Sequence, residues 1–482
     1  VLGAAHVDVL EPDPVIYRLV KPQLDSLTTI MPQARSTVNL HQASPQAYLS
    51  KTGQRFELID IAPEFLDQGQ ANKYIFTEEG IQELVGSLSE RGILSISVAI
   101  GEFTVYAVKT AGTIKKALAD LGLEHPERHI MVYRSSWNAR LLVSRTPWTN
   151  EDITRLQTFC SDRSFDTCYF SGLDPTTVNV WNDLPAVSFE DGTVSSAGSG
   201  VKDALMDELM ALFSQDNKAG AVSTFFNLAP STYDRPFFYS ILKLSRAADV
   251  LKRIDIIPRP EMGNLINLAV LSQAVIFALI VLLLPMLRRR ALHMSWSGVG
   301  VSIVYFMCLG LGFLFIEITL IERFTFFLND AVSAFAIVIC AMLIFSGLGS
   351  GFSSRYVDRT AKGIRLAGGA VVIMIILFIS ALSPLLNLVM SWPILAKAGL
   401  IIVILAPLSF VLGMMFPLGL STFSAERSGF LPWAWSINGA FSVIATPLAN
   451  ILAVTYGYSV VFIAAAGLYL LAALAGAKLN SK

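Results

Sequence analysis

The stretch VDVLEPDPVI (residues 7–16) lies close to the start of the sequence and indicates the fold of its first part. Its apolar and polar residues alternate up to Glu11, as they do along a β-strand. Pro12 and Pro14 then fix the backbone for a turn and for the first residue of a helix. In a doubly wound sheet, an acid at this end of a strand can accept hydrogen bonds from the two hydroxyls of a ribose. The pattern alone leaves two interpretations of Glu11, a ribose-binding residue or a polar residue that ends a surface strand.

The sequence that follows alternates β-branched runs with helical stretches, and this alternation predicts a parallel, doubly wound sheet. Helices are expected at 14–30, 77–90 and 103–121. Strands are expected at 7–11, 36–42, 56–61, 92–100, 128–134 and 139–145. We therefore expect an α/β domain over residues 1–145. Residues 146–260 are less regular and are expected to form an α/β extension and connector, with a capping box at Thr149–Asp152 that begins a helix.

Charge is absent from long stretches after residue 260, although it is spread evenly before it. Only 15% of all residues are charged, against about 25% in soluble proteins, and about 20 apolar residues suffice to span a bilayer. We expect an all-α transmembrane bundle over 261–482, with the lipid bilayer as its partner. Its seven helices are expected at 264–287, 298–321, 331–353, 366–390, 397–420, 433–455 and 458–477, the last two separated at Thr455–Tyr458.

Other composition data limit the classes of function. The net charge of −1 gives no reason to expect a nucleic-acid partner. Four scattered cysteines and five histidines, with neither a CxxC pair nor an HExxH motif, predict no metal site and no disulfide framework.

Several segments carry a family resemblance. VDVLEPDPVI (7–16) resembles the second-strand motif of spermidine synthases and related S-adenosylmethionine-dependent transferases, and NKYIFTEEGI (72–81) with LSERGILSIS (88–97) resembles their helix and fifth strand. TYDRPFFYSIL (232–242) and the membrane motifs are similar to those of bacterial multi-pass membrane proteins that carry a spermidine synthase-like domain. These membrane motifs are LGLGFLFIEITLIERFTFFL (309–328), IFSGLGSGF (344–352), GMMFPLGL (413–420) and PWAWSINGAFSV (432–443).

The resemblance implies a Rossmann-like fold of the methyltransferase and spermidine synthase type, with the first strand and its glycine-rich loop expected upstream of Val1. It implies S-adenosylmethionine or decarboxylated S-adenosylmethionine as cofactor. Glu11 and Pro12 would lie at the ribose, Ser44 near the adenine and Asp60 in the pocket. The acceptor would be a small amine or a lipid-soluble molecule, and the location would be the bacterial inner membrane.

The sequence departs from the family pattern where the chemistry occurs. The acid that helps to deprotonate the attacking amine falls at Ala62, and Ser44 stands where related transferases often have an acid. Asp60 lies two residues before Ala62 on the same strand face, so it is the one candidate for a catalytic role, with a polar strand end as the alternative. Because a positioned base typically contributes 10²–10⁴-fold, ordinary aminopropyl transfer is doubtful and methyl transfer is less affected. The catalytic residue stays unknown.

A second interpretation is a non-catalytic transporter or sensor with a degenerate nucleotide-fold domain, and a third is a structural partner in a membrane complex. Glu317 and Glu322 are the polar candidates within the membrane part, because ionisable residues in spans are costly. Glu317 is expected about one turn from a helix end and Glu322 at the interface. Gly347, Gly349 and Gly351 are expected at close helix contacts.

The side of the membrane is open, because the loop charges favour an external α/β domain, whereas a cofactor made inside cells favours a cytoplasmic one. Because of the cofactor, we expect the α/β domain in the cytoplasm.

Overall fold

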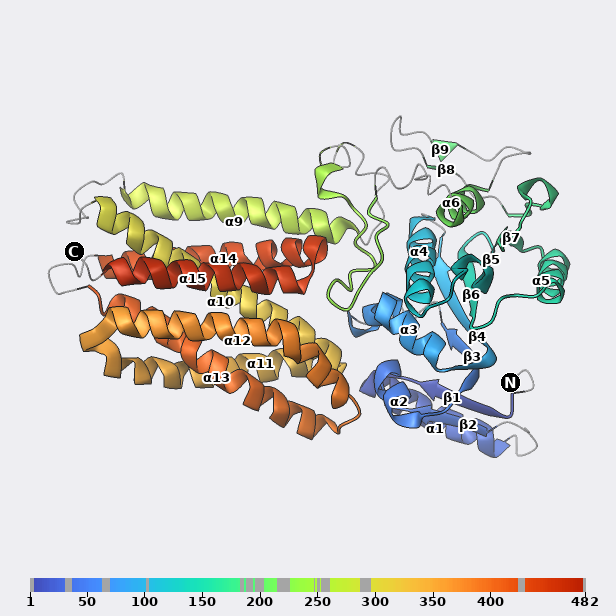
Figure 1. The fold of residues 1–482 in the computed structure, drawn as a ribbon, viewed down its shortest axis with the longest axis horizontal. Coiled ribbons are helices and arrows are strands. Elements are labelled where there is room, and N and C mark those ends of the chain that lie inside the picture. Colours follow the sequence, from blue (N-terminus) through green and yellow to red (C-terminus); the bar gives the residue numbers. More distant parts are fainter. Residues whose placement is uncertain are drawn as a thin grey trace. The chain divides into compact units, whose positions relative to one another are not determined.

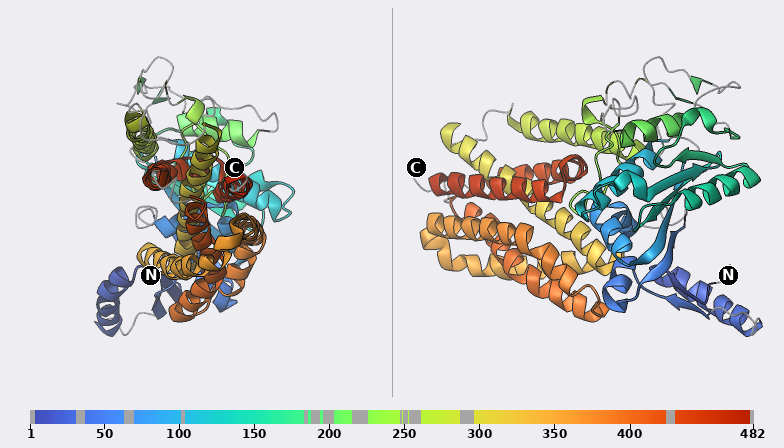
Figure 2. Two further views of the ribbon diagram at one scale, coloured as in Figure 1. Left: turned by 90° about the vertical axis from the view of Figure 1, so that its left-hand side faces the viewer. Right: turned by 45° about the vertical axis from the view of Figure 1, so that its right-hand side comes forward.

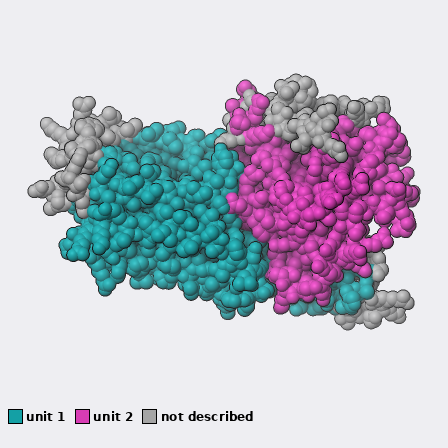
Figure 3. Space-filling model, in the orientation of Figure 1, with its two compact units in different colours: residues 1–44, 266–482 teal, residues 45–265 magenta. Residues whose placement is uncertain are grey.

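The computed structural model divides the chain into two compact units, residues 1–44 with 266–482 and residues 45–265 (Figure 3). It describes residues 4–30, 37–62, 70–100, 104–182, 186–187, 194–195, 203–214, 226–246, 248, 252, 261–286, 296–423 and 430–479.

The first unit begins with a β–α–β arrangement. Strands β1 (His6–Leu10) and β2 (Thr37–His41) pair in parallel as a two-stranded sheet, and α1 (Pro14–Ile30) connects them. The carboxylate of Asp13 accepts hydrogen bonds from the backbone N–H groups of Val15 and Ile16, which caps α1. The strand, turn and helix predicted from VDVLEPDPVI are thus confirmed.

The second unit contains a five-stranded sheet in the order β3-β4-β6-β5-β7. Its strands are β3 (Phe56–Ile61), β4 (Leu88–Ala99), β5 (Ile130–Arg134), β6 (Asn138–Ser144) and β7 (Asp166–Tyr169). Only β3 and β4 pair in parallel, and the other neighbours are antiparallel. The prediction of a wholly parallel sheet is wrong, because the short link between β5 and β6 permits a hairpin, whereas a parallel crossover needs a dozen or more residues.

Helices cover the sheet on both faces (Figure 1). One apolar core joins the sheet to α3 (Glu78–Gly86), α4 (Val105–Asp120) and α6 (Ala204–Phe213), and a smaller core on the other face packs α5 (Asn150–Arg163) against β5. The capping box of α5 is present as predicted. The helix predicted over 77–90 ends at Gly86, and β4 begins at Leu88.

The remaining elements are short. They are α2 (Pro45–Thr52), β8 (Ala186–Val187), β9 (Val194–Ser195) and the 3₁₀ turns η2 (Gln70–Phe76), η3 (Pro126–His129), η4 (Pro175–Thr177), η5 (Leu244–Arg246) and η8 (Ser354–Arg359).

The C-terminal part is that of a multi-pass membrane protein. Its described residues hold six apolar helical segments long enough to cross a bilayer, and the 58-residue segment Ala331–Leu388 comprises two helices, α11 and α12, joined by η8. The long helices are α9 (Met262–Met286), α10 (Trp296–Leu328), α11 (Ala331–Ser353), α12 (Thr360–Leu388), α13 (Ile394–Leu420), α14 (Leu431–Tyr456) and α15 (Tyr458–Leu479). The break between α14 and α15 lies at Gly457, where φ is 98°, as the sequence predicts.

Helix α10 is the centre of this bundle, since it packs against α11, α13, α14 and α15 (Figure 2). Glycines allow the close approach. A Cβ added at Gly349 would collide with the carbonyl of Phe410, and one added at Gly413 would collide with the carbonyl of Ser346. Both contacts join α11 to α13, as small residues do between membrane helices. The same prediction is wrong for Gly347 and Gly351, whose added Cβ would meet no atom within 4 Å.

Candidate functional site

Glu11 follows β1 directly and braces the turn into α1. Its backbone N–H donates to the carbonyl of His41, 3.0 Å away, and its Oε1 accepts the backbone N–H of Asp13 at 2.9 Å. Oε2 forms no hydrogen bond with a described residue, and the side chain is only partly buried. A carboxylate offers about four acceptor positions. Glu11 therefore holds the turn and keeps enough acceptor capacity for two ribose hydroxyls.

Pro12 and Ser44 lie at the same edge of the two-stranded sheet as Glu11. Pro12 belongs to the turn after β1. Ser44 follows the end of β2, is buried, and precedes Pro45 at the start of α2, where serine commonly caps a helix. Because β1 and β2 are parallel, their carboxyl ends lie at one edge, so these three predicted residues follow the same edge of the sheet.

Asp60 belongs to the other unit and is held by an ion pair. Its Oδ1 lies 2.6 Å from Nη1 of Arg140, and the same nitrogen donates to the hydroxyl of Ser95 at 2.7 Å. These residues come from β3, β6 and β4, on the sheet face opposite α3 and α4. Arg140 thus occupies one carboxylate oxygen of Asp60. Ala62, next on the same face, is exposed and carries no acid.

The buried charges of the second unit form two further groups, and both are bonded throughout. Arg134, 1% exposed, lies 3.1 Å from Asp166 and 2.7 Å from Asp203. Asp166 also accepts the backbone N–H groups of Trp181 and Asn182, and Asp203 caps α6. The network ties β5, β7 and α6 together and leaves no charge for a ligand.

The second group lies at the start of α9. Glu261, fully buried, accepts the backbone N–H groups of Ile241 and Leu242 and the amide of Asn264. Lys109 donates to the carbonyls of Phe237 and Ser240 at 3.1 and 3.2 Å. Burial, helped by the charge of Arg235, lowers the pKa of Lys109 to about 7, and Glu261 opposes the shift. A neutral amine has two hydrogens to donate, which these two carbonyls accept.

The two membrane candidates differ in their surroundings. Glu322 accepts a hydrogen bond from the hydroxyl of Tyr458 at 3.0 Å, and Arg323 lies over the Tyr458 ring. Since Tyr458 begins α15, these contacts place Glu322 beside the start of that helix. Glu317 is half-buried and has no hydrogen bond or ion pair with any described residue. The expectation that it lies one turn from a helix end is wrong, because α10 continues to Leu328, about three turns further.

Lys397 was expected as the first residue of a membrane helix, and it lies in the first turn of α13. It is 7% exposed, and its Nζ donates to the carbonyl of Phe327 at 2.9 Å. The lysine thus ties α13 to the end of α10. Its charge is therefore weak evidence for the side of the membrane.

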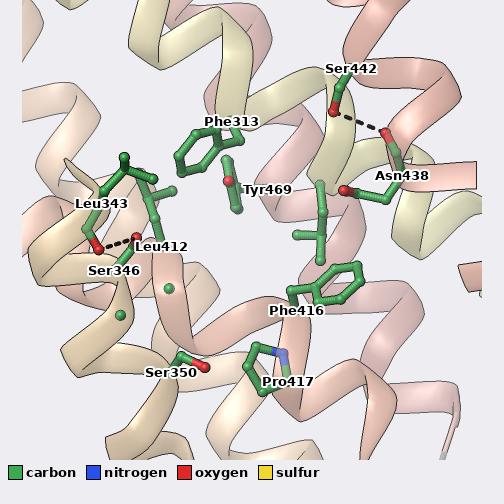
Figure 4. Close-up of a pocket in the computed structure, with 13 residues that line it drawn as sticks. Phe313, Leu343, Ser346, Ser350, Leu412, Phe416, Pro417, Asn438, Ser442 and Tyr469 are labelled. Carbon is green, nitrogen blue, oxygen red and sulfur yellow. Dashed lines mark hydrogen bonds between the residues drawn. The ribbon is translucent and has the colours of Figure 1, made fainter. Parts of the chain in front are cut away.

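Sequence reasoning missed a cavity of about 310 Å³ among the membrane helices (Figure 4). Helices α10, α11, α13, α14 and α15 contribute its walls, and none of its lining residues is charged. Phe313, Phe416 and Tyr469 supply aromatic rings, and Asn438 and three serines supply polar atoms. The available signals were Pro417 inside α13 and an asparagine within a predicted span, because polar residues in spans tend to mark function.

Comparison with known proteins gives this chain no relative. No protein-family model matches it, and neither a curated protein nor a solved structure was found that does.

Proposed function

We propose that this protein is a membrane-anchored transferase whose α/β part binds an adenosyl compound at Glu11 and transfers a methyl group to a lipid-soluble or small amine acceptor. The observation that carries the proposal is the geometry of Glu11, at the carboxyl end of a parallel strand, with one carboxylate oxygen unbonded to any described residue. S-adenosylmethionine, or its decarboxylated form, would supply the group that is transferred.

The strand pairs support the Rossmann-like part of the proposal. In the order 3-2-1-4-5-6 of dinucleotide-binding folds, strand 1 lies between strands 2 and 4. If β1 to β4 take positions 2 to 5, they are expected to form two separate parallel pairs, 3-2 and 4-5. The parallel pairs found are β1 with β2 and β3 with β4. The resemblance of residues 7–16 to the second strand of spermidine synthases makes the same assignment.

Within that assignment, Glu11 would orient the ribose through its two hydroxyls, and Ser44 would meet the adenine edge through a neutral hydroxyl. The choice of methyl over aminopropyl transfer rests on the missing base. Ala62 replaces the expected acid, and Arg140 holds Asp60 at 2.6 Å. A less basic acceptor that needs little deprotonation suits such a site better than an ammonium group does.

The proposed location is the bacterial inner membrane, with the α/β part in the cytoplasm. Adenosyl donors are made inside cells, and the family resemblance is to bacterial membrane proteins. The apolar helices α9 to α15 support the membrane part of this proposal.

The test is calorimetric titration of the full-length protein in nanodiscs with S-adenosylmethionine, its decarboxylated form and methylthioadenosine. Glu11→Ala should weaken binding by about 10–100-fold, since hydrogen bonds to a charged group are worth about 1.5–3 kcal/mol each. The control, Glu124→Ala, removes an exposed acid after α4 and should bind as wild type does. Equal binding by Glu11→Ala and wild type, or no binding by either, refutes the proposal.

A second candidate is a non-catalytic transporter or sensor, and two features of the membrane helices favour it. One is the uncharged cavity among five helices. The other is Glu317, which lies near the middle of the span Val299–Leu328 without a described partner. An absence of adenosyl binding in the titration would favour this candidate over the transferase.

A further inference from the structure

The membrane cavity is lined by a tyrosine whose hydroxyl has unused hydrogen-bonding capacity. Tyr469 is 1% exposed, and its hydroxyl forms no hydrogen bond with any residue that the structure describes. Two other buried tyrosines of the bundle are satisfied, Tyr305 by the carbonyl of Met415 at 2.6 Å and Tyr458 by Glu322 at 3.0 Å. Buried tyrosine hydroxyls usually find a partner, because an unpaired one costs free energy. Tyr469 therefore points to a partner that enters the cavity.

Two other helices that line the cavity, α13 and α14, offer acceptors. Asn438 donates its amide to the carbonyl of Phe306 at 3.3 Å, and its side-chain oxygen, which forms no hydrogen bond with a described residue, extends toward the cavity (Figure 4). Pro417 has no N–H group, so the carbonyl of Gly413, which also lines the cavity, lacks its usual helical donor. A ligand hydroxyl can accept a hydrogen bond from the Tyr469 hydroxyl and donate one to either of these oxygens.

Shape and charge restrict the ligand further. The rings of Phe313, Phe416 and Tyr469 line the cavity, and aromatic rings pack well against another flat ring. A charged ligand would lack a counter-ion, because no lining residue is charged. The volume of about 310 Å³ is at the small end of ligand pockets, about 300–1,000 Å³. These properties describe a small, neutral, aromatic or quinone-like molecule.

The cavity also has an exposed edge. Leu343 is 64% exposed and Gly347 is exposed, and both line it from α11. Because these residues lie within a membrane span, the edge opens toward the bilayer, from which a lipid-soluble molecule can enter without crossing water.

We propose that this cavity is a binding site for a neutral, lipid-soluble molecule with a flat ring and a hydroxyl or carbonyl at its edge. Tyr469 and Asn438 would bind the polar group, and Phe313 and Phe416 would pack against the ring. The site does not depend on adenosyl binding, so it goes beyond the proposed transferase function.

The experiment uses 1-naphthol as the probe, titrated into the full-length protein in nanodiscs, with empty nanodiscs as the partitioning baseline. Naphthalene has the ring without the hydroxyl, and 1-naphthoate carries a charge. Saturable binding of 1-naphthol is expected, with binding of naphthalene and of 1-naphthoate at least about tenfold weaker. No saturable binding of 1-naphthol, or equal binding of naphthalene, overturns the proposal.

Two pairs of variants locate the site. Tyr469→Phe should weaken 1-naphthol binding about tenfold, the size expected for one buried hydrogen bond, whereas Tyr356→Phe, outside the cavity, should not. Gly347→Leu places a side chain where no atom lies within 4 Å, at the cavity wall, and should block binding, whereas Gly351→Leu, one turn away and outside the lining, should not. The glycine pair keeps the test decisive if Tyr469→Phe fails to fold. If the two variants of each pair change 1-naphthol binding equally, the molecule does not bind in this cavity.

Discussion

The α/β unit (the second unit, residues 45–265) and the membrane helices place polar groups in their interiors in different ways. In the α/β unit the buried polar groups include full charges, and Arg134, Asp166, Asp203, Lys109 and Glu261 are each bonded to several partners. In the membrane helices the cavity is lined by neutral groups only, and the hydroxyl of Tyr469 has no described partner.

This difference distinguishes polar groups that stabilise the fold from polar groups that can bind a ligand. A buried charge with complete bonding has no capacity left for a ligand, and its removal leaves its partners uncompensated. A neutral group without a partner adds little to the fold and is free to recognise a molecule. The buried charges of the α/β unit should therefore govern its stability, and the cavity should govern binding.

The largest effect is expected from Arg134→Met. The substitution leaves Asp166 and Asp203 without their shared cation, and breaking a buried pair costs about 3–5 kcal/mol. Thermal unfolding in nanodiscs, followed by tryptophan fluorescence, measures it. Arg155→Met is the matched control, because its pair with Glu151 is exposed on both sides and should contribute under about 1 kcal/mol. Similar losses of thermal stability in both variants would show that the Arg134 network does not stabilise the α/β unit.

A smaller effect is expected from glycine substitutions in α11. Gly349→Ala forces a methyl group against the carbonyl of Phe410, and overpacking costs about 1–3 kcal/mol. Gly347→Ala meets open space and should be neutral or slightly stabilising, since alanine favours helix. The unfolding temperatures of the two variants, measured side by side in nanodiscs, check this. A larger loss for Gly347→Ala would contradict the described packing of α11 on α13.

The smallest effect, taken per pH unit, is the pH dependence of the α/β unit. Lys109 has a pKa of about 7 in the folded protein, against 10.5 ordinarily. Between these two pKa values the unfolded chain binds one more proton than the folded protein, so stability should rise with pH from about 7 to 10. Below pH 7 the folded protein must bury a charged ammonium, and its stability is lowered by the full cost of that burial.

The slope from one such group is at most about 1.4 kcal/mol per pH unit. Lys109→Met should flatten the dependence, and Lys115→Met, which removes a partly buried lysine from the same helix, should leave it unchanged. If the stability of the wild type falls more steeply than that of Lys109→Met as the pH rises from 7 to 10, the predicted sign is wrong.

Local patterns were sufficient to predict most elements. The strands of the α/β part and the seven membrane helices follow from alternation and from uncharged stretches, and helix α1 from Asp13 and Pro14. Pairing was less predictable, because strand direction depends on the short β5–β6 link and on β7, a four-residue strand that no pattern indicated. The extent of α10 was underestimated, since Glu322 and Arg323 suggested an end where their contacts with Tyr458 allow the helix to continue.

The candidate site was predictable only where it is local. Glu11 could be named because it directly follows a strand, whereas Ser44, three residues after β2, could be named only from the family resemblance. The Arg134 network joins residues up to 69 positions apart, and the cavity combines five helices, so no spacing along the chain indicates either. Tyr469 in particular reads as an ordinary apolar helix residue, and only its missing partner distinguishes it.

Electron cryo-microscopy of the full-length protein in nanodiscs with saturating 1-naphthol would show directly whether the cavity binds the ring. We expect non-protein density of a flat ring between Phe313 and Phe416, with a polar atom within hydrogen-bond distance of the Tyr469 hydroxyl. A cavity that holds only water, or a Tyr469 hydroxyl bonded to a neighbouring helix, would contradict it.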